Sequence, residues 1–352
     1  MQKTMLHYLH LELKAKMAPF AGFEMPIQYQ GVKEEVLAVR KSVGIFDVSH
    51  MGEFFVQGKD CYKYLDYLLT NDIQSPDVGK AIYSPLCRQD GTVIDDVIVY
   101  KLSVDCAMVC VNAANIDKDW QWLEKNKSDF AIDLLNESSN YSLIALQGPK
   151  SEEIVEKLDL KTAQKLSYYS CTRHKNLIIA RTGYTGEDGF EIFGPHQEIL
   201  NLWQQSIAQK AVPCGLAARD VLRLEVGYPL YGNELSDDVT PLDSGLKWTL
   251  KKTDVDFIGK QSLLENPGKN RLLKLSIDKG IPRLGYLIIN SNKETVGKVT
   301  SGTFSPIIEK GIALAHIERS KFSDTENYFL VIRGKEIPIQ VHKKPFVSGG
   351  HK

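Results

Sequence analysis

Short apolar strands and amphipathic helices alternate over the first two-thirds of the chain. Apolar residues recur at helical spacing in EEVLAVRKSV, which begins at residue 34, and in GLAARDVLRLEVG, which begins at residue 215, so each predicts a helix. The β-rich runs AIYSPLC and VIDDVIVYKL are separated by the turn sequence RQDGT, which predicts a β-hairpin. The pattern indicates a mixed α and β fold.

Further segments repeat this pattern on both sides of the hairpin. GIFDVSHMGEFFVQG predicts strands around a turn, and CYKYLDYLLTND predicts a helix. CAMVCVNAANIDKDWQWLEK predicts a strand followed by a helix, with Asn112 or Asn115 as its N-cap. YSLIALQGPKSEEIVEKL predicts strand, turn and helix, and NLIIARTGYTGEDGFEIFG predicts two strands joined by a loop.

The pattern changes past about residue 270. Apolar runs such as RLLKLSID, GIALAHIE and NYFLVIRGKEIPIQVHKKPFV are separated by turns rich in Gly, Pro, Asn and Ser. This composition predicts a separate C-terminal β-barrel-like domain, joined to the rest by the linker ENPGKN at residues 265–270. At 352 residues, the length alone favours two or three domains of roughly 150 residues each.

Two adjacent carboxylates interrupt the strand sequence GTVIDDVIVYK at residues 91–101. Because side chains alternate along a strand, Asp95 lies on one apolar face and Asp96 on the other. Glu191 occupies a similar place between two apolar residues in GFEIF. A buried carboxylate without a partner costs several kcal/mol or takes up a proton, so these acids need a reason to be there.

Two explanations fit the strand acids. Tyrosines lie near them in the sequence, and aromatic walls with a few acceptors suit a flat heterocycle with N–H donors, such as a pterin or a purine. The other explanation is an internal ion pair with an arginine, and for any single acid it is at least as good. The tyrosines are Tyr83, Tyr100, Tyr168 and Tyr184, and the candidate arginines are Arg181, Arg219 and Arg223.

Charge and composition narrow the class of protein. Lys and Arg number 43 against 44 Asp and Glu, so the overall charge favours neither nucleic acid nor a membrane as partner. The N-terminal residues predict no signal peptide, and no apolar run is long enough to span a bilayer. The six cysteines form no CxxC pair, and Cys106 and Cys110 share one strand face, which favours buried thiols over zinc ligands. We expect a reduced cytoplasmic protein.

Familiar catalytic motifs are absent from the sequence. It contains no GxxxxGK[ST], HExxH or GxSxG, which leaves phosphate-loop, zinc-protease and serine-hydrolase chemistry without an anchor. The glycine-rich TGYTGEDG lacks the GxGxxG spacing and precedes a strand, so it offers no helix N-terminus to a pyrophosphate. On local grounds a tight connection between two strands explains it equally well.

A set of segments, taken in order, closely resembles the aminomethyltransferase (T-protein) family of the glycine cleavage system. The segments are AGFEMPIQY, VRKSVGIFDVSHMGE, GTVIDDVIVY, VCVNAANIDKDW, ALQGPKS, RTGYTGEDGFEIF, GLAARDVLRLEVGYPLYGNEL and DFIGK. The resemblance runs from about residue 15 to the C-terminal KKPFV, nearly the whole chain. Each segment is weak alone, but together they are highly specific.

The resemblance implies an α+β, multidomain fold around a central folate-binding hole. The first α+β domain, which binds folate, is discontinuous and comprises residues 1–50 and 141–264. The second, a ferredoxin-like α+β domain at residues 51–140, carries Asp96, and residues 271–352 form a C-terminal β-barrel. The first two domains are therefore expected to interleave along the chain.

The resemblance also implies an activity. The family transfers the one-carbon unit of the aminomethyl group from the lipoyl arm of the H-protein to tetrahydrofolate. The products are 5,10-methylenetetrahydrofolate, ammonia and the dihydrolipoyl H-protein. Tetrahydrofolate is then the acceptor substrate, and no metal is expected. The contact with lipoylated H-protein is expected to be transient, and the free protein to be a monomer that binds neither nucleic acid nor a membrane.

Individual roles follow from the motifs of the family. Asp96, the second acid of IDD, matches the catalytic aspartate, and Glu191 in GFE matches a folate-contacting position. Arg219 in AARD matches a substrate-binding position. Asp95 is turned away from Asp96 and is expected to be structural.

Further family positions line the hole. For Asn112 a helix cap, and for each tyrosine simple core packing, remain alternative explanations. The chain departs from relatives at Phe23, where tryptophan is usual, at Ala217, where glycine is usual, and in its C-terminal SGGHK, whose His351 has no assigned role. The further positions are Tyr83, Asn112, Tyr168 and Tyr184.

Three other functions stay open at the level of sequence. A non-catalytic folate-binding relative, acting in iron–sulfur protein or tRNA-modification pathways, would carry a KGCY-type motif where this chain has RLEVGYPLYGNE. The folate domain of a sarcosine or dimethylglycine oxidase would need a flavin-binding dinucleotide domain, which the sequence lacks. A structural subunit that only docks on the H-protein would not need Asp96 or Glu191.

Overall fold

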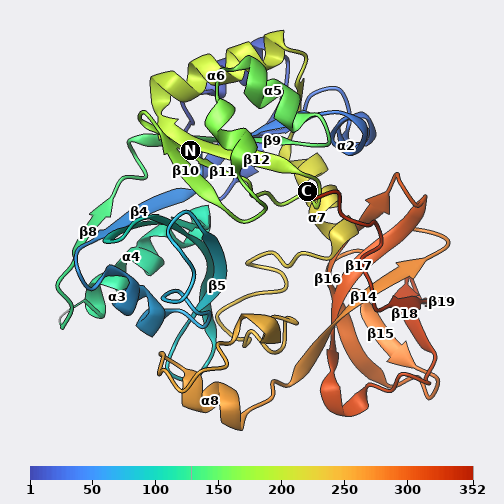
Figure 1. Ribbon diagram of the computed structural model, residues 1–352. Helices are drawn as coiled ribbons and strands as arrows, with labels where there is room; N and C mark the ends of the chain where they lie inside the picture. Colours follow the sequence, from blue (N-terminus) through green and yellow to red (C-terminus); the bar gives the residue numbers. More distant parts are fainter. Residues whose placement is uncertain (128, 352) are drawn as a thin grey trace.

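Three β-sheets form the framework of the protein, and the computed structural model describes residues 1–127 and 129–351 (Figure 1). Six-stranded and five-stranded sheets lie in the first two-thirds of the chain, and a seven-stranded sheet lies at the C-terminal end. Figure 1 shows them as three lobes, with loops and helix α7 (Leu216–Val226) between them. The predicted α+β, multidomain fold with a C-terminal barrel is confirmed, although the barrel sheet is curled and not closed.

The six-stranded sheet gathers strands that are far apart in the sequence. One of its faces is buried by apolar side chains from helices α1 (His7–Glu12), α5 (Ser151–Lys157) and α6 (His196–Ala208). All neighbouring strands are antiparallel except the last pair. In spatial order the strands are β10 (Cys171–His174), β11 (Leu177–Ala180), β12 (Gly189–Pro195), β9 (Tyr141–Gln147), β3 (Gly44–Asp47) and β13 (Val212–Pro213).

The five-stranded sheet is antiparallel and carries the strand with the two acids. Helices α3 (Cys61–Leu68) and α4 (Ile116–Lys125) cover one face, where the apolar residues of both helices pack on the strands. In spatial order the strands are β5 (Ala81–Cys87), β6 (Val93–Ser103), β7 (Cys106–Val111), β4 (Gly52–Gln57) and β8 (Asp133–Asn136).

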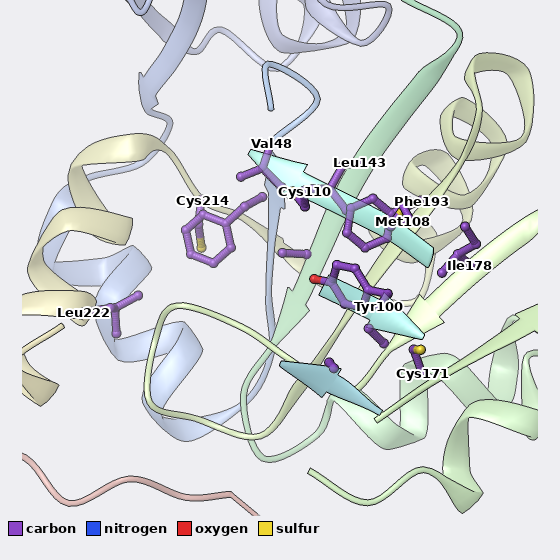
Figure 2. Close-up of a cluster of buried hydrophobic side chains, with 14 of the residues drawn as sticks. Val48, Tyr100, Met108, Cys110, Leu143, Cys171, Ile178, Phe193, Cys214 and Leu222 are labelled. Carbon is purple, nitrogen blue, oxygen red and sulfur yellow. The ribbon is translucent and has the colours of Figure 1, made fainter. Parts of the chain in front are cut away.

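A shared hydrophobic core joins these two sheets (Figure 2). Met108 and Cys110 of β7 belong to the same cluster as Leu143 of β9 and Phe193 of β12. The rings of Tyr100 and Phe193 meet edge to face, with centroids 5.2 Å apart and planes at 65°. Edge-to-face contact is a favourable arrangement for aromatic rings, so this cluster fixes β6 and β12 relative to each other.

The seven-stranded sheet forms the curled C-terminal lobe. The short helix α8 (Lys260–Glu265) precedes it in the chain. The sheet has its own apolar core, which is built from alternate residues of its central strands. In spatial order the strands are β19 (Lys335–Pro338), β18 (Tyr328–Ile332), β15 (Leu287–Asn290), β16 (Thr295–Ser305), β17 (Lys310–Glu318), β14 (Asn270–Ile277) and β20 (Gln340–His342).

Shorter elements complete the description. A hairpin of β1 (Lys16–Phe20) and β2 (Phe23–Gln28) lies before helix α2 (Val32–Lys41). None of the helices among the described residues is long and apolar enough to cross a membrane. The 3-10 helices are η1 (Ala113–Asn115), η2 (Lys161–Lys165), η3 (Lys247–Thr249) and η4 (Arg319–Lys321).

Helix α7 connects the lobes through buried charges. The Arg223 guanidinium donates to Glu234 Oε2 at 2.9 Å and to Ser301 Oγ of β16 at 2.7 Å, and both charged side chains are at most 1% exposed. Thr300 Oγ1 donates to the other oxygen of Glu234 at 2.5 Å. Helix α7, the loop after it and a barrel strand are therefore held by one enclosed network.

A second network joins α7 to α2. Arg40 donates to Glu225 Oε2 at 2.7 Å and to Glu187 Oε1 at 2.9 Å. Ser305 Oγ, at the end of β16, donates to Glu225 Oε1 at 2.6 Å. Paired in this way, the buried charges have the hydrogen bonds that offset their loss of water.

Most of the elements predicted from the sequence are confirmed, including the hairpin of β5 and β6 and the strand–helix pair of β7 and α4. The strands of GIFDVSHMGEFFVQG form as predicted, but β3 and β4 belong to different sheets. Helix α8 reaches Glu265 and β14 starts at Asn270, so the connection is shorter than the predicted linker. The domain limits proposed from the sequence stay a prediction.

We predict that Glu234→Gln destabilises the protein strongly. The amide removes the charge opposite Arg223 and turns an N–H group toward existing donors, so the free energy of unfolding should fall by about 3–5 kcal/mol. Urea-induced unfolding measures this. Glu318→Gln, which breaks only an exposed pair with Lys321, is the matched control and should change stability by less than about 1 kcal/mol. Equal effects of the two changes would contradict the role of the buried network.

Candidate active site

A cavity of about 1080 Å³ lies between the three sheets. Residues from β5, β6 and β12, from α7 and from β14 line it, so every lobe contributes to its wall. Its size suits a ligand larger than a single ring. Each of the residues assigned from the sequence lines this cavity: Tyr83, Asp96, Asn112, Tyr168, Tyr184, Glu191 and Arg219.

Asp96 reaches the cavity from the middle of β6, on the face that also carries Ile98 and Tyr100. Its Oδ2 accepts a hydrogen bond from the Tyr83 hydroxyl at 3.0 Å, and its Oδ1 accepts one from Asn112 Nδ2 at 2.9 Å. Burial, followed by the nearby charge of Asp95, raises the pKa of Asp96 to about 7, against the effect of both hydrogen bonds. A carboxylate with such a pKa can take up and release a proton near neutral pH.

Asp95 points to the opposite side of β6 and is fully buried there. It accepts hydrogen bonds from the Asn112 backbone N–H at 3.0 Å, from Asn112 Nδ2 at 2.8 Å and from Asn115 Nδ2 at 2.6 Å. Asp119 lies next to it, and burial together with the Asp95 charge raises the pKa of Asp119 to about 11, so Asp119 is protonated. Asp95 thus anchors the segment that follows β7.

Asn112 connects the two acids. Its side-chain amide donates to Asp95 Oδ1, to Asp96 Oδ1 and, at 3.1 Å, to the Asp96 carbonyl. Asn112 and Asn115 stand at the first positions before η1 and α4, but neither makes a side-chain capping bond. The helix-cap explanation for Asn112 is therefore wrong, since its amide is used to orient Asp96.

Glu191 reaches the same cavity from β12. Its Oε2 accepts hydrogen bonds from Thr182 Oγ1 at 2.6 Å and from the Tyr100 hydroxyl at 3.4 Å. Among the described residues none donates to Oε1, and this atom is not enclosed by protein. One carboxylate oxygen of Glu191 is therefore held in place while the other faces the cavity.

The ion-pair explanation for these acids is wrong. Arg181 pairs with Asp188 at 2.7 Å, and Arg223 pairs with Glu234. Within the described part of the chain, no Lys, Arg or His lies within 4.0 Å of a carboxylate oxygen of Asp96 or Glu191. Neutral donors hold both carboxylates, which leaves their charge available to a ligand.

Arg219 of α7 lines the cavity, as does Arg223 one turn later, but only Arg223 is paired with a carboxylate among the described residues. The guanidinium carbon of Arg219 lies 4.8 Å from the centre of the Tyr184 ring, an arrangement typical of a cation–π contact. Nη1 is enclosed, whereas Nε and Nη2 are not enclosed and have no hydrogen-bond partner among the described residues, so these two nitrogens face the cavity. Burial lowers the pKa of Arg219, with Glu191 the first charge to oppose it. An unmet donor of this kind calls for an acceptor oxygen or nitrogen on a ligand.

The three assigned tyrosines are half-buried in the cavity wall, and polar contacts hold two of them. Tyr83 donates to Asp96 and stacks on Trp248, with ring centroids 5.9 Å apart. The Tyr184 hydroxyl donates to the Pro229 carbonyl. Their hydroxyl bonds and the cavity at their edges show that core packing alone does not explain these positions.

The loop TGYTGEDG connects β11 to β12, which confirms the strand-connection explanation. A Cβ on Gly183 would lie 1.9 Å from Gln147 Oε1, and Gly186 has a φ of +79°. Glycine is therefore required at both positions for steric reasons. The close packing places Tyr184 against the cavity.

The C-terminal tail runs along this loop. Gly350 N donates to the Gly186 carbonyl at 2.9 Å, and a Cβ on Gly350 would lie 2.3 Å from Glu187 Oε2. The tail thereby places the His351 ring on Tyr168, with centroids 3.9 Å apart and planes at 25°. Burial lowers the pKa of His351, so the ring is neutral and stacks as an aromatic group.

Sequence reasoning assigned no role to several other residues in the cavity wall. An acid in an apolar strand is visible in the sequence, but a histidine or tryptophan in a loop gives no comparable signal, because its surroundings come from other parts of the chain. Tyr100 did give a signal, because it is a tyrosine on the strand face of Asp96, but it received no role. The unassigned wall residues include His50, Tyr100, Tyr169, Tyr228 and Trp248.

Two models of known protein domains match the sequence and define the family to which the chain belongs. The model of the GCVT N-terminal domain matches residues 6–254, and that of the glycine cleavage T-protein C-terminal barrel domain matches residues 270–348. An N-terminal domain of this type followed by the barrel is the architecture described above. The chain belongs to the glycine cleavage T-protein family.

Individual relatives match along the whole chain. An aminomethyltransferase of Thermosipho melanesiensis is 44% identical over 361 residues, which cover 100% of this chain and 99% of that protein. One of Thermotoga maritima is 43% identical over 360 residues, covering 99% and 98%. The crystal structure of glycine cleavage system aminomethyltransferase T from Bartonella henselae matches with a TM-score of 0.93 and 31% identity over 99% of both chains.

We predict that Asp95→Asn acts on stability. The new amide would turn an N–H group toward the donors of Asn112 and Asn115, so the free energy of unfolding should fall by about 1–3 kcal/mol. Urea-induced unfolding at neutral pH measures the loss. Asp105→Asn changes an exposed carboxylate in the turn between β6 and β7 and should have little effect. An unchanged stability of the Asp95 variant would show that these hydrogen bonds contribute nothing.

Proposed function

We propose that this protein is the aminomethyltransferase of a glycine cleavage system and that tetrahydrofolate accepts the one-carbon unit. The observation that carries the proposal is the presence of Asp96 and Glu191 in one cavity, each held only by neutral donors. Such carboxylates can accept N–H groups of a ligand and stabilise positive charge on it. Membership of the family indicates aminomethyl transfer as the reaction class, and the residues of the cavity support tetrahydrofolate as the acceptor.

The residues present fit a reduced folate. Glu191 Oε1 is open to accept N–H donors, which a pterin ring presents along one edge. The tyrosine rings of the wall offer flat apolar surfaces to a heterocycle. Arg219 Nε and Nη2 are open to the cavity without a partner among the described residues, and the ring carbonyl and the glutamate carboxylates of a folate are acceptors.

Asp96 has the properties that the reaction requires of a base. N5 attacks a methylene iminium derived from the donor, and the C–N bond to the amino group then breaks and releases ammonia. N10 next bonds to the same carbon and closes the ring, and N10 must lose a proton in this step. Asp96, with a pKa of about 7, can accept that proton and can stabilise the cationic species before it. Tyr83 and Asn112 keep the carboxylate oriented while its charge changes.

The donor is proposed to be lipoylated H-protein in a transient complex. Exposed lysines of LKAK and HKKPF, such as Lys14 and Lys344, can attract an acidic partner, whereas Lys251 of KKTDVDFIGK is buried against Asp66 and cannot. We further propose that the protein works as a cytoplasmic monomer. The proton-accepting geometry of Asp96 disfavours a non-catalytic folate-binding relative.

Asp96→Asn should abolish most turnover while tetrahydrofolate still binds. Loss of a positioned proton acceptor lowers kcat by about two orders of magnitude or more. In the wild-type protein the basic form of Asp96 is present above its pKa, so kcat/KM should rise with pH up to about 7 and then level off. Ammonia release from aminomethylated H-protein, followed from low to high pH, measures both. Near-normal turnover in the variant would rule out this role.

Glu191→Gln should weaken binding of tetrahydrofolate by about tenfold or more, because an acceptor becomes a donor that faces N–H groups of the ligand. Titration calorimetry with tetrahydrofolate measures the dissociation constant. Glu198→Gln, on the outer surface of α6, is the control and should bind as the wild type does. If both variants bind equally well, Glu191 does not contact the folate.

A further inference from the structure

His50 is a buried polar residue of the cavity wall that the proposed reaction leaves unused. It lies in the turn between β3 and β4 and is only 4% exposed. Nδ1 is enclosed and has no partner among the described residues. Nε2 has no hydrogen-bond partner in residues 1–127 and 129–351 either, but it is not enclosed, so it faces the cavity that the ring lines. A buried histidine with both nitrogens unmet is unfavourable unless a ligand meets one of them.

The surroundings of His50 are apolar. The Phe20 ring meets it edge to face, with centroids 5.4 Å apart, and Met51 and Ala21 line the cavity beside it. Phe20 is 39% exposed and also lines the cavity, so this part of the wall lies where the cavity meets the surface. An apolar chain that enters from outside would pass these side chains first.

The charged groups near His50 keep its ring neutral. Burial lowers the pKa of His50 to about 4, and the Arg219 charge acts in the same direction. Asp47 acts against it, but the Asp47 carboxylate is already bonded to Thr4 at 2.7 Å and to His10 at 2.8 Å. With no acceptor at Nδ1, the ring proton belongs on Nε2 and points toward the cavity.

We propose that His50 receives the sulfur end of the donor arm, with Nε2–H donating a hydrogen bond to the sulfur as the aminomethyl group leaves it. Phe20 and Met51 pack against the aliphatic part of the arm. This proposal rests on the proposed function and names the donor side of the same cavity. It separates the wall into an acidic part, with Asp96 and Glu191 for the acceptor, and an apolar part for the donor.

The chemistry of the step favours a neutral donor at this place. After the donor ammonium has lost one proton to solvent, the nitrogen lone pair forms the C=N bond. The C–S bond breaks, and its electron pair goes to sulfur. The resulting thiolate is stabilised by the N–H group of His50, which keeps its own proton, and later takes a proton from water. A neutral imidazole gives this hydrogen bond without repelling the ammonium group of the incoming donor.

The test compares two substitutions with a control. His50→Phe keeps the size and the aromatic contact but removes the donor, so kcat with aminomethylated H-protein should fall by about a hundredfold, while the dissociation constant for tetrahydrofolate changes by less than about twofold. His50→Gln carries an N–H group and should keep about a tenth or more of the wild-type kcat. His316→Phe is the matched control, since His316 is a buried barrel histidine with an unmet Nε2 that does not line the cavity.

Thermal unfolding shows whether each variant folds, and His50→Met replaces His50→Phe if the latter does not. Unchanged kcat in the apolar variant overturns the proposal, and so does an equal loss in His50→Gln or a parallel loss of folate affinity. The proposed function fails in a different way, because the wild-type protein itself would then release no ammonia from aminomethylated H-protein in the presence of tetrahydrofolate.

Discussion

The cavity depends on the buried ion pair between Arg223 and Glu234. This pair ties helix α7 to the loop that follows it and, through Ser301, to strand β16 of the barrel. Arg219 lies four residues earlier on the same helix and so projects from the same side, toward the cavity. Because the pair is enclosed, solvent screens it little, and the position of Arg219 follows from a strong contact that takes no part in ligand binding.

Charged side chains that hold the fold are paired with an opposite charge, whereas three charged side chains of the cavity wall are not, within the part of the chain that the structure describes. Arg40, Arg181 and Arg223 each bind a carboxylate within 2.9 Å. Arg219 contacts the Tyr184 ring and pairs with no carboxylate among the described residues, and Asp96 and Glu191 accept only neutral donors. The charges that hold the fold are thus neutralised within the chain, whereas Arg219, Asp96 and Glu191 keep their electrostatic effect for a ligand. Such a site needs little reorganisation when charge develops in it.

Strand periodicity was enough to predict that Asp95 and Asp96 lie on opposite faces of the strand, because these faces are fixed by local geometry. The partners of the acids were not predictable, since a choice among Arg181, Arg219 and Arg223 depends on tertiary distances. Asn112 shows the same limit: its position before a helix is that of a cap, yet its amide binds acids 16 and 17 residues earlier. Nor could the sequence show that β3 and β4, which are neighbours in the chain, enter different sheets.

The C-terminal tail shows how the fold and the cavity are linked. Val347 N donates to the carbonyl of Glu225 at 3.0 Å, and the side chain of Glu225 binds Arg40 of α2 and Ser305 of the barrel. Beyond this anchor, backbone bonds to the loop, the stack on Tyr168 and a 3.5 Å contact between the Tyr228 hydroxyl and His351 Nε2 hold the tail, with no ion pair among the described residues 348–351. The firmly bonded part of the wall carries the charges, and the weakly bonded part carries only aromatic surface. Adjustment to a large ligand is therefore easiest at the tail, where movement does not disturb Asp96, Glu191 or Arg219.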